Sequence, residues 1–309
     1  MRVFRGFPDV SNGVAHGHVA LTIGNFDGVH RGHQAMLTRL VEAADDLRLA
    51  SAVLTFDPHP REFFARDAAP PRLSSVRGRL EQFRAHGVDR VYIARFNAAL
   101  AALTAQEFID RILVQRLGVR WVLVGDDFRF GRGRLGNLAV LRASAATFSV
   151  EAMRTISIDA ERASSSAVRA ALAAGELEHA QRLLGRPYAI SGRVAHGAKL
   201  GTRLGFPTAN IALRHKPALS GIFAVCVHGL GPLREGVASL GVRPTVAAKP
   251  VPLLEVYLLD FHESIYGRRV RVEFLRKLRD EERYPDLDSL TRQIRLDVAN
   301  AREFFAAQS

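Results

Sequence analysis

The chain has 309 residues, of which 48% are hydrophobic and 24% charged, and its formal net charge at pH 7 is +12. This length suffices for about two domains with sizeable cores, and no apolar run is long enough to cross a bilayer or to form the core of an export signal. The single cysteine, Cys226, excludes an internal disulfide bond, so we expect a cytoplasmic protein in which Cys226 is a core residue.

The first half of the sequence alternates segments typical of strands and helices. Apolar residues predict a strand that ends at Ile23 and, at helical spacing, a helix over 33–47. Later strands are predicted at 51–57, 88–96 and 119–125, and later helices at 76–87 and 104–118. Thr104 and Glu107 are placed to cap the last of these helices. The alternation predicts an α/β domain with a parallel sheet, helices on both faces and a site at the carboxyl ends of the strands.

The segment GNFDGVHRGH, residues 24–33, joins the first predicted strand to the first predicted helix. Free N–H groups and the positive end of the helix dipole suit a phosphate there, and His30 and His33 would extend the same anion site. Taken alone, the segment is equally compatible with an ordinary turn whose histidines cap and pack. The absence of lysine before Lys199 excludes a P-loop in this half. It also argues against an aminoacyl-tRNA synthetase, which pairs a similar turn with a lysine-bearing loop.

Three more motifs of this half carry polar groups that could face a substrate. They are TFDPHP with Asp57 and His59, GDDFRFG with Asp126, Asp127 and Phe128, and SSSAVR with Ser164, Ser165, Ser166 and Arg169. The hydroxyl cluster and its arginine suit a second anion, although SSSAVR alone would most simply be a serine-capped helix. Two anion sites without a nucleophile indicate nucleotidyl transfer, in which one phosphate directly attacks the α-phosphate of a nucleotide.

The second half of the sequence becomes rich in short strands near Gly185–Tyr188. Helical turns are predicted within 164–188, before this change. The strand-like segments that follow are 188–197, 221–230, 236–242, 253–261 and 268–278. They predict a small closed antiparallel β-barrel, and the spacing of apolar residues over 286–305 predicts a C-terminal helix packed on it. We therefore divide the chain into domains at 1–185 and 186–309.

The barrel sequence contains GAKLGTRLGFPTANI, residues 197–211, which combines spaced glycines with a proline turn. Glycines let a backbone approach a phosphate closely. They stand at Gly197, Gly201 and Gly205. Pro207 fixes a turn that presents Thr208 and Asn210 as neutral oxygen ligands beside the phosphates. Such ligands suit Mg²⁺, which takes few protein ligands and keeps phosphate oxygens and waters.

Glu255 stands in the otherwise apolar segment LLEVYLLD, residues 253–260. A carboxylate is costly to bury unless it is paired or catalytic, so Glu255 is a candidate catalytic residue. An outward-facing structural glutamate on a strand explains the same pattern equally well.

Together these motifs resemble those of the bacterial bifunctional riboflavin kinase/FMN adenylyltransferases, also called FAD synthetases, from about Leu21 to Phe305. The resemblance implies a Rossmann-like nucleotidyltransferase domain followed by a riboflavin kinase barrel. The barrel would phosphorylate riboflavin to FMN with release of ADP. The N-terminal domain would then transfer the adenylyl group of ATP to FMN, giving FAD and pyrophosphate. Mg²⁺ would serve both steps.

The resemblance also implies roles for individual residues. The groups holding ATP for adenylyl transfer, with both histidines stabilising phosphate charge, would be Gly24, Asn25, Phe26, Asp27, His30, His33, Ser164, Ser165, Ser166 and Arg169. The groups facing the flavin in that reaction would be Asp57, His59, Asp127 and Phe128. The ATP-binding groups of the kinase would be Gly197, Gly201, Gly205, Thr208 and Asn210. Of these, Thr208 and Asn210 would bind Mg²⁺, and Glu255 would be the general base for the ribityl hydroxyl.

The sequence departs from the family pattern at three positions. Ser166 stands where the family more often has Thr, which keeps the hydroxyl. Arg203 follows Gly201 by two residues, whereas relatives commonly have Arg directly after that glycine. Ser239 stands where Asn is usual. We expect Arg203 to reach a different phosphate oxygen and Ser239 to weaken a contact near the kinase site.

Two other functions fit parts of the sequence. A nucleotidyltransferase for another phosphorylated acceptor would use the barrel only for binding, and it would not need GFPTAN or Glu255. A nucleic-acid-binding protein would concentrate its positive charge in one part of the chain. Here both halves share it, with 24 basic and 19 acidic residues over 1–185 and 19 basic and 12 acidic residues over 186–309. It would also interleave aromatic residues with Arg and Lys on the barrel strands. We therefore expect riboflavin, FMN, FAD and ATP as partners, with no nucleic acid and no membrane, and the oligomeric state stays open.

Overall fold

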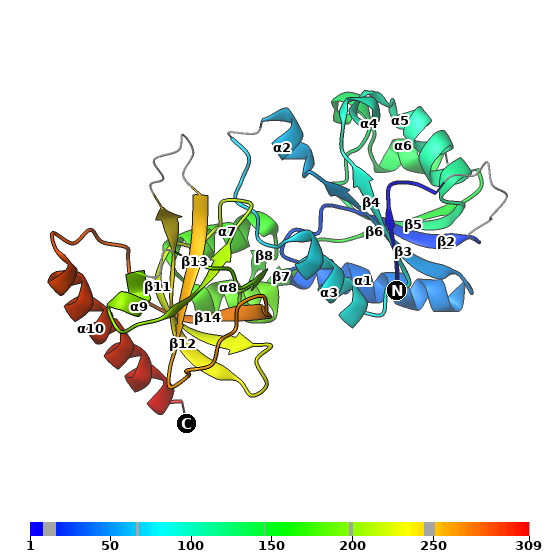
Figure 1. Ribbon diagram of the computed structural model, residues 1–309. Coiled ribbons are helices and arrows are strands. Elements are labelled where there is room, and N and C mark those ends of the chain that lie inside the picture. The colour runs from blue at the N-terminus through cyan, green and yellow to red at the C-terminus, as the bar shows by residue number, and fades with distance from the viewer. Residues whose placement is uncertain (9–16, 66–67, 145, 198–199, 244–250, 309) are drawn as a thin grey trace. The chain divides into compact units, whose positions relative to one another are not determined.

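The computed structural model describes the chain except residues 9–16, 66–67, 145, 198–199, 244–250 and 309 (Figure 1). The described residues divide into two compact units. The first comprises Met1–Pro70 and Val76–Ser164, and the second comprises Pro71–Ser75 and Ser165–Ser309. Within the described parts of the chain, no helix combines the length and the apolar character that a membrane span requires.

The first unit is built on a six-stranded sheet in which all neighbouring strands are parallel. Its strands are β1 (Arg2–Arg5), β2 (Val19–Ile23), β3 (Ala50–Asp57), β4 (Arg90–Arg95), β5 (Val119–Gly125) and β6 (Ser149–Met153). They lie in the order β1-β4-β3-β2-β5-β6. The parallel α/β sheet predicted from the sequence is confirmed. The structure adds the edge strands β1 and β6, which lack the continuous apolar run of a central parallel strand.

Helices cover both faces of this sheet. They are α1 (Arg31–Asp46), α2 (Pro60–Phe64), α3 (Val76–Ala85), α4 (Ala98–Ala102), α5 (Ala105–Glu107), the π-helix η2 (Phe108–Arg116), the 3₁₀ turn η3 (Arg132–Arg134) and α6 (Leu138–Ala143). Successive residues of β2 point to opposite faces, so Leu21 packs in one core with Ile109 of η2, and Ala20 packs in another with Leu40 of α1. A short hairpin of β7 (Ser157–Ile158) and β8 (Glu161–Arg162) precedes the end of the unit.

The helix predicted at 104–118 is present, although most of it has π rather than α geometry. Thr104 begins it as expected. Its hydroxyl accepts the Glu107 N–H at 3.1 Å, and the Glu107 carboxylate accepts the Thr104 N–H at 3.0 Å. The capping box is therefore confirmed, whereas the sequence gives no sign of the π geometry.

The strand order reverses direction at β2, which fixes where a site can form. From β2 the chain continues through β3 to β4 on one side, and it returns to place β5 on the other side of β2. In open parallel sheets the crevice for ligands lies at this switch point, outside the carboxyl ends of the strands. The predicted motifs directly follow β2, β3 and β5, so three of the four motifs of this half lie at the edge where that rule places a site.

The second unit contains a nearly closed antiparallel barrel. Its strands are β9 (Ala189–Arg193), β10 (Thr208–Ala212), β11 (Gly221–His228), β12 (Arg234–Arg243), β13 (Val251–Leu258) and β14 (Arg269–Arg279), in the order β10-β13-β12-β11-β14-β9. An isolated bridge links the two edges, since the Ala195 N–H donates to the Asn210 carbonyl at 2.8 Å. The predicted barrel is confirmed, with β10 as a strand that the sequence does not predict.

The described residues of this unit also form the helices α7 (Ser165–Ala174), α8 (Leu177–Leu184), α9 (Leu200–Arg203) and α10 (Leu287–Ala306). Leu172 of α7 and Leu183 of α8 share one buried core with Phe223 and Phe274 of the barrel strands. This packing groups both helices with the barrel, whereas the sequence places the domain boundary after them.

The predicted C-terminal helix is confirmed as α10, and it covers an outer face of the barrel. Its residues Ala301 and Phe305 are buried against Ala224 and Cys226 of β11. Cys226 is therefore the core residue predicted from the sequence. Burial raises the pKa of its thiol, which keeps the group protonated and inert.

Candidate active sites

The loop between β2 and α1 brings the two predicted histidines into contact. His30 is the N-cap of α1 and His33 lies in its first turn. Their rings stack with centroids 3.7 Å apart, and the Phe26 ring lies 4.9 Å from His33. His30 and Asp27 are both buried, at 7% and 6% exposure. The predicted placement of both histidines at a helix entrance is confirmed.

This loop holds its backbone in unusual conformations. Phe26 and Val29 have φ angles of 51° and 43°, a left-handed region that side chains rarely adopt. A Cβ added at Gly24 would lie 3.0 Å from the Phe26 ring, so only glycine fits without a shift. The Val29 carbonyl accepts the Gln34 side-chain amide at 2.9 Å. Such strain persists only where surrounding contacts impose it, and it clusters at functional sites.

The electrostatics of the loop favour a neutral His33. Burial, the neighbouring His30 and the Arg79 cation together hold the pKa of His33 well below its usual value. The buried His33 Nδ1 and Asn25 Oδ1 atoms have no hydrogen-bond partner among the described residues. A neutral imidazole still donates one N–H, so His33 could bind a phosphate oxygen as a hydrogen-bond donor rather than as a cation.

Arg79 is a part of this site that the sequence does not predict. It lies on α3 with only 5% exposure, and its guanidinium donates to the Asn25 carbonyl and to the Thr55 hydroxyl, both at 2.8 Å. A buried arginine looks like any other helix arginine in the sequence, so only the tertiary structure reveals it.

The TFDPHP motif continues from the end of β3 into α2. Asp57 is the last residue of β3, and His59 is the N-cap of α2. His59 Nδ1 accepts the Arg61 N–H at 3.1 Å, which gives this side chain a capping role. A cluster of phenylalanines adjoins the motif, in which Phe63, Phe64 and Phe96 contact one another and Phe96 also contacts Phe56.

The GDDFRFG motif follows β5 and is tied to the β7–β8 hairpin. Asp127 accepts a hydrogen bond from the Arg162 guanidinium at 2.5 Å, and both side chains are largely exposed. The Phe128 ring stacks on Phe130 with centroids 5.4 Å apart. The motif thus combines an exposed carboxylate with an aromatic surface.

The SSSAVR motif spans the end of the first unit and the start of α7. Ser164 closes the first unit, whereas Ser165, Ser166 and Arg169 belong to the second. The Arg169 guanidinium donates to the Pro71 carbonyl at 2.7 Å and to the Ser165 carbonyl at 3.2 Å. The predicted helix start is confirmed, and the approach of this motif to the ATP of the first unit stays a prediction.

In the barrel, strand pairing places the predicted kinase residues in one row. Asn210 of β10 is opposite Glu255 of β13, and Glu255 is opposite Ser239 of β12. Residues directly opposite in antiparallel strands share a face. The neighbours Leu254 and Val256 point into the barrel core. Glu255 therefore faces outward and is half-buried, beside Asn210.

The glycine-rich segment packs closely on β10. A Cβ added at Gly197 would lie 2.5 Å from the Asn210 side chain, and one at Gly201 would overlap the Phe206 carbonyl. Gly205 has a φ of +87°, which favours glycine. Thr208 and Asn210 lie on strand β10 itself rather than on a turn, which corrects the expectation from Pro207. Alternation along the strand still directs both side chains to the face of Glu255.

Asn210 fits the predicted role of an oxygen ligand. Its side chain is buried at 7% exposure, and its amide nitrogen donates to the Thr208 carbonyl at 3.1 Å. Its Oδ1 atom has no hydrogen-bond partner in the described part of the chain. A buried acceptor without a donor is costly unless a ligand completes it. No cluster of three His, Cys, Asp or Glu residues forms a metal site among the described residues, so a cation here would rely on neutral oxygens and substrate phosphates.

A second carboxylate, Glu281, lies near Glu255 and is not predicted from the sequence. A Cβ added at Gly241 would overlap the Glu281 carboxylate, which places this group against β12. Burial and the nearby Glu255 raise the pKa of Glu281, and the Arg279 cation opposes them. The kinase face thus carries two interacting carboxylates.

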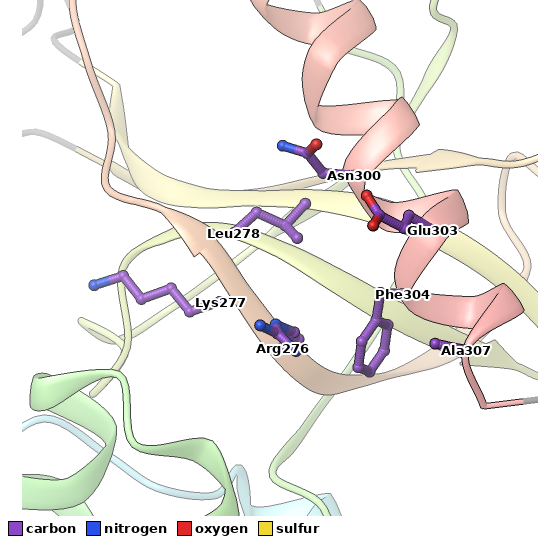
Figure 2. A pocket seen from close by; sticks show the side chains of 7 residues that line it. All are labelled: Arg276, Lys277, Leu278, Asn300, Glu303, Phe304 and Ala307. Carbon is purple, nitrogen blue, oxygen red and sulfur yellow. The ribbon is translucent and has the colours of Figure 1, made fainter.

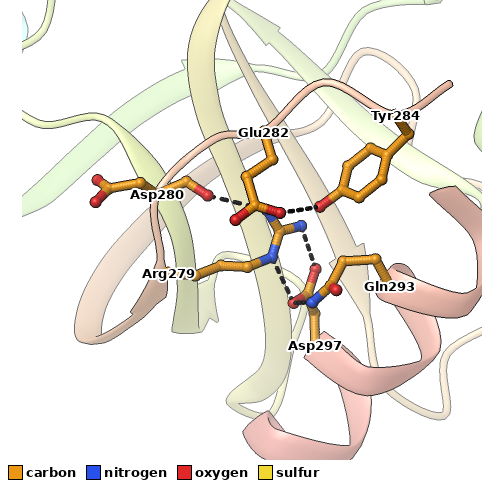
Figure 3. A network of polar contacts seen from close by, with 6 residues as sticks. All are labelled: Arg279, Asp280, Glu282, Tyr284, Gln293 and Asp297. Atoms are coloured by element: carbon orange, nitrogen blue, oxygen red, sulfur yellow. Dashed lines mark hydrogen bonds and ion pairs between the residues drawn. The ribbon is translucent and has the colours of Figure 1, made fainter. Parts of the chain in front are cut away.

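A network of polar contacts around the buried Asp297 links the end of β14, the segment after it and α10 (Figure 3). Arg279 at the end of β14 donates to both carboxylate oxygens of Asp297 on α10, at 2.8 and 2.7 Å, and Gln293 donates to Asp297 at 3.0 Å. The Arg279 guanidinium lies over the Tyr284 ring. The Tyr284 hydroxyl in turn donates to the Glu282 carboxylate at 3.0 Å. The network fixes the segment between β14 and α10 from both ends.

A separate cavity of about 350 Å³ lies between β14 and α10 (Figure 2). Its lining includes Arg276 of β14 and Glu303 and Phe304 of α10. None of its lining residues belongs to a motif identified in the sequence, so the cavity is not one of the two candidate sites.

Two family models match the chain, one for each set of motifs. The FAD synthetase model matches residues 14–167, and the riboflavin kinase model matches residues 184–305. The first match contains the loop of His30 and His33, and the second contains Asn210 and Glu255.

Curated relatives match along nearly the whole chain. A bifunctional riboflavin kinase/FMN adenylyltransferase of Pseudomonas fluorescens is 49% identical over 94% of both chains. That of Escherichia coli K12 is 47% identical over 99% of this chain and 98% of its own. A crystal structure described as a macrolide-efflux protein from Streptococcus pneumoniae covers 97% of this chain and 98% of its own, with a TM-score of 0.80 and 26% identity. The chain therefore belongs to the family of bifunctional riboflavin kinase/FMN adenylyltransferases, with the adenylyltransferase in its N-terminal part and the riboflavin kinase in its C-terminal part.

Proposed function

We propose that the loop between β2 and α1 binds the ATP used for adenylyl transfer. The observation that carries this assignment is the stacked pair of the buried His30 and the half-buried His33 at the N-terminus of α1, at the switch point of the sheet. Backbone groups of Gly24, Asn25 and Phe26 would line the same phosphates. The helix dipole and the imidazole N–H groups would stabilise the negative charge that moves to the departing pyrophosphate.

Adenylyl transfer at this site needs no covalent intermediate. An oxygen of the FMN phosphate attacks the α-phosphorus of ATP, the bond to the bridging oxygen breaks, and pyrophosphate leaves. The protein contributes orientation and charge stabilisation. On the flavin side we assign Asp57, His59, Asp127 and Phe128. On the ATP side we further assign Asp27, Ser164, Ser165, Ser166 and Arg169.

In the barrel, we assign Glu255 as the general base and the glycine-rich segment as the ATP site. Glu255 would accept the proton of the terminal ribityl hydroxyl. The hydroxyl oxygen would attack the γ-phosphorus of ATP at the same time, and ADP would leave. Asn210 Oδ1 and the Thr208 hydroxyl would hold Mg²⁺ beside the phosphates, which fits the unmatched Asn210 acceptor. Mg²⁺ there would neutralise phosphate charge. Gly197, Gly201 and Gly205 would let the backbone approach ATP.

The two activities give the chain a place in flavin metabolism. It would take up riboflavin, pass through FMN and release FAD, consuming one ATP in each step. Consumption of ATP fits the cytoplasmic location expected from the sequence. We keep 1–185 and 186–309 as the proposed functional division, although α7 and α8 pack in the core of the barrel unit.

Incubation of the purified protein with riboflavin, ATP and Mg²⁺ tests the assignment as a whole. We expect FMN to form first and FAD to follow, as resolved by chromatography of the flavins. Excess EDTA should abolish both products, and added Mg²⁺ should restore them, because metal neutralises the transferring phosphates. If phosphorylation or adenylation proceeded equally fast with and without EDTA, that step would not require a metal ion.

We expect a fragment spanning Ser165–Ser309 to convert riboflavin to FMN and to make no FAD. This fragment keeps Leu172 and Leu183, which share the core of the barrel. A fragment starting at Arg186 should keep the same activity but unfold at a lower temperature, because it exposes that core. FAD produced by either fragment from riboflavin, ATP and Mg²⁺ would contradict the division of activities.

A further inference from the structure

Arg79 connects two motifs that are far apart in the sequence. Besides its bonds to the Asn25 carbonyl and the Thr55 hydroxyl, its guanidinium reaches the Phe56 carbonyl at 3.5 Å. The Thr55 hydroxyl in turn donates to the Asn25 carbonyl at 3.2 Å. One buried cation thereby ties the loop after β2 to the end of β3, where the flavin motif begins.

The same helix also fixes the side chain that gives the loop its shape. Phe83 follows Arg79 by four residues on α3, so both point to the same side of the helix. The Phe83 ring meets the Phe26 ring edge-on, with centroids 5.3 Å apart, and Phe26 is fully buried. Phe26 is the residue with left-handed backbone directly after Asn25. Helix α3 therefore holds this strained turn at two points, the Asn25 carbonyl through Arg79 and the Phe26 ring through Phe83.

The cation also acts electrostatically on His33. The titratable and charged groups that act on His33 are His30 from the loop and Arg79 from α3. Both favour the neutral imidazole, as does burial. An arginine cannot lose its own proton in this range, so its influence on His33 is permanent.

We propose that Arg79 is a positioning residue for adenylyl transfer, holding the loop between β2 and α1 in the conformation that presents His30 and His33 to the phosphates of ATP. The inference rests on the proposed function of that loop. Arg79 acts through the Asn25 carbonyl and the Thr55 hydroxyl, and it need not touch a substrate.

The test compares Arg79→Met and Arg79→Lys in the full-length protein. Met removes the charge and the donors at similar volume, whereas Lys keeps the charge but not the planar fork. We expect Arg79→Met to lower the kcat for FAD formation from FMN by about 10²-fold, the effect of misplacing catalytic groups. The kcat of Arg79→Lys should lie between those of Arg79→Met and the parent. Arg84→Met on the exposed side of α3 is the matched control and should leave kcat unchanged.

The pH profile separates positioning from a merely structural role. Loss of the cation removes the smallest of the three causes that lower the pKa of His33, so the acidic limb of kcat/KM should move slightly to higher pH in Arg79→Met, while burial and His30 still hold the pKa below its ordinary value. The limb should stay in place in Arg79→Lys. Parental kcat in Arg79→Met would overturn the proposal, and so would an equal loss in both variants with an unmoved limb.

Two further measurements keep the result interpretable. FMN formation from riboflavin, measured in the same preparations, should equal that of the parent, since Arg79 lies outside the barrel. If Arg79→Met does not fold, Arg79→Lys decides: a kcat at least threefold below the parent supports the proposal, and a parental kcat overturns it. Failure of the proposed function itself would look different, because the parent protein would then make no FAD.

Discussion

We expect Glu255→Gln to lower the riboflavin kinase kcat by about 10² to 10⁴-fold, the usual contribution of a positioned general base. The ribityl hydroxyl is a poor nucleophile unless its proton is removed as the new bond forms. Gln keeps the size of the side chain and much of its hydrogen bonding, but it cannot accept that proton. The KM for riboflavin should stay within a few-fold, and adenylation of supplied FMN should be unaffected. Initial rates of both half-reactions measure the effect.

The position of Glu255 makes this variant informative. The side chain faces outward on β13, as a structural glutamate would, but it lies opposite the buried Asn210 and close to Glu281. An outward-facing residue with no catalytic role would tolerate Gln almost silently. Glu263→Gln, at an exposed position of the same unit, is the control for simple loss of charge. A kinase rate for Glu255→Gln within about threefold of the parent, far short of a base's contribution, would remove it from the mechanism.

Local signals in the sequence predict the elements that carry the motifs. The helical spacing after His33 predicts α1, and Thr104 with Glu107 predicts the start of the helix formed by α5 and η2. Asp286 caps α10 by accepting the Ser289 N–H at 2.7 Å, at the start of the segment predicted as a helix. In each case a side chain near in sequence satisfies the backbone, so the signal can be read without the rest of the fold.

Elements that depend on distant partners are not predicted. The segment Thr208–Ala212 follows glycines and a proline, which indicate a loop, yet it forms β10 because β13 offers a complete row of partners. Strand propensity is weak compared with such pairing. The same holds for Arg79, which is buried against the Asn25 loop, and for Glu281, whose carboxylate lies against Gly241 only in the folded barrel. Local motifs in the sequence therefore point to the candidate site residues, whereas the residues that support them are revealed only by the tertiary structure.

We expect His33→Ala to lower the kcat of FAD formation by about 10²-fold or more, as loss of one preorganised donor to a developing charge does. His30→Ala should act in the same direction, because the two rings stack and share the helix entrance. KM for ATP should change less than kcat, since the donors act mainly on charge that appears in the transition state. FMN formation from riboflavin should stay near the parental rate. FAD formation from supplied FMN, ATP and Mg²⁺ gives the comparison.

The pH dependence makes the assignment of His33 more specific. Burial, His30 and Arg79 lower its pKa, so in the parent His33 stays neutral at pH 7 and binds a proton only well below the usual histidine value near 6.5. The adenylyltransferase should therefore keep its activity as the pH falls through 6.5 and lose it only well below that value, where His33 binds a second proton. His18→Ala, which removes an exposed imidazole just before β2, should change neither kcat nor this profile. A rise in KM for ATP with unchanged kcat in His33→Ala would reduce its role to ground-state binding, and equal loss of both activities would indicate misfolding instead.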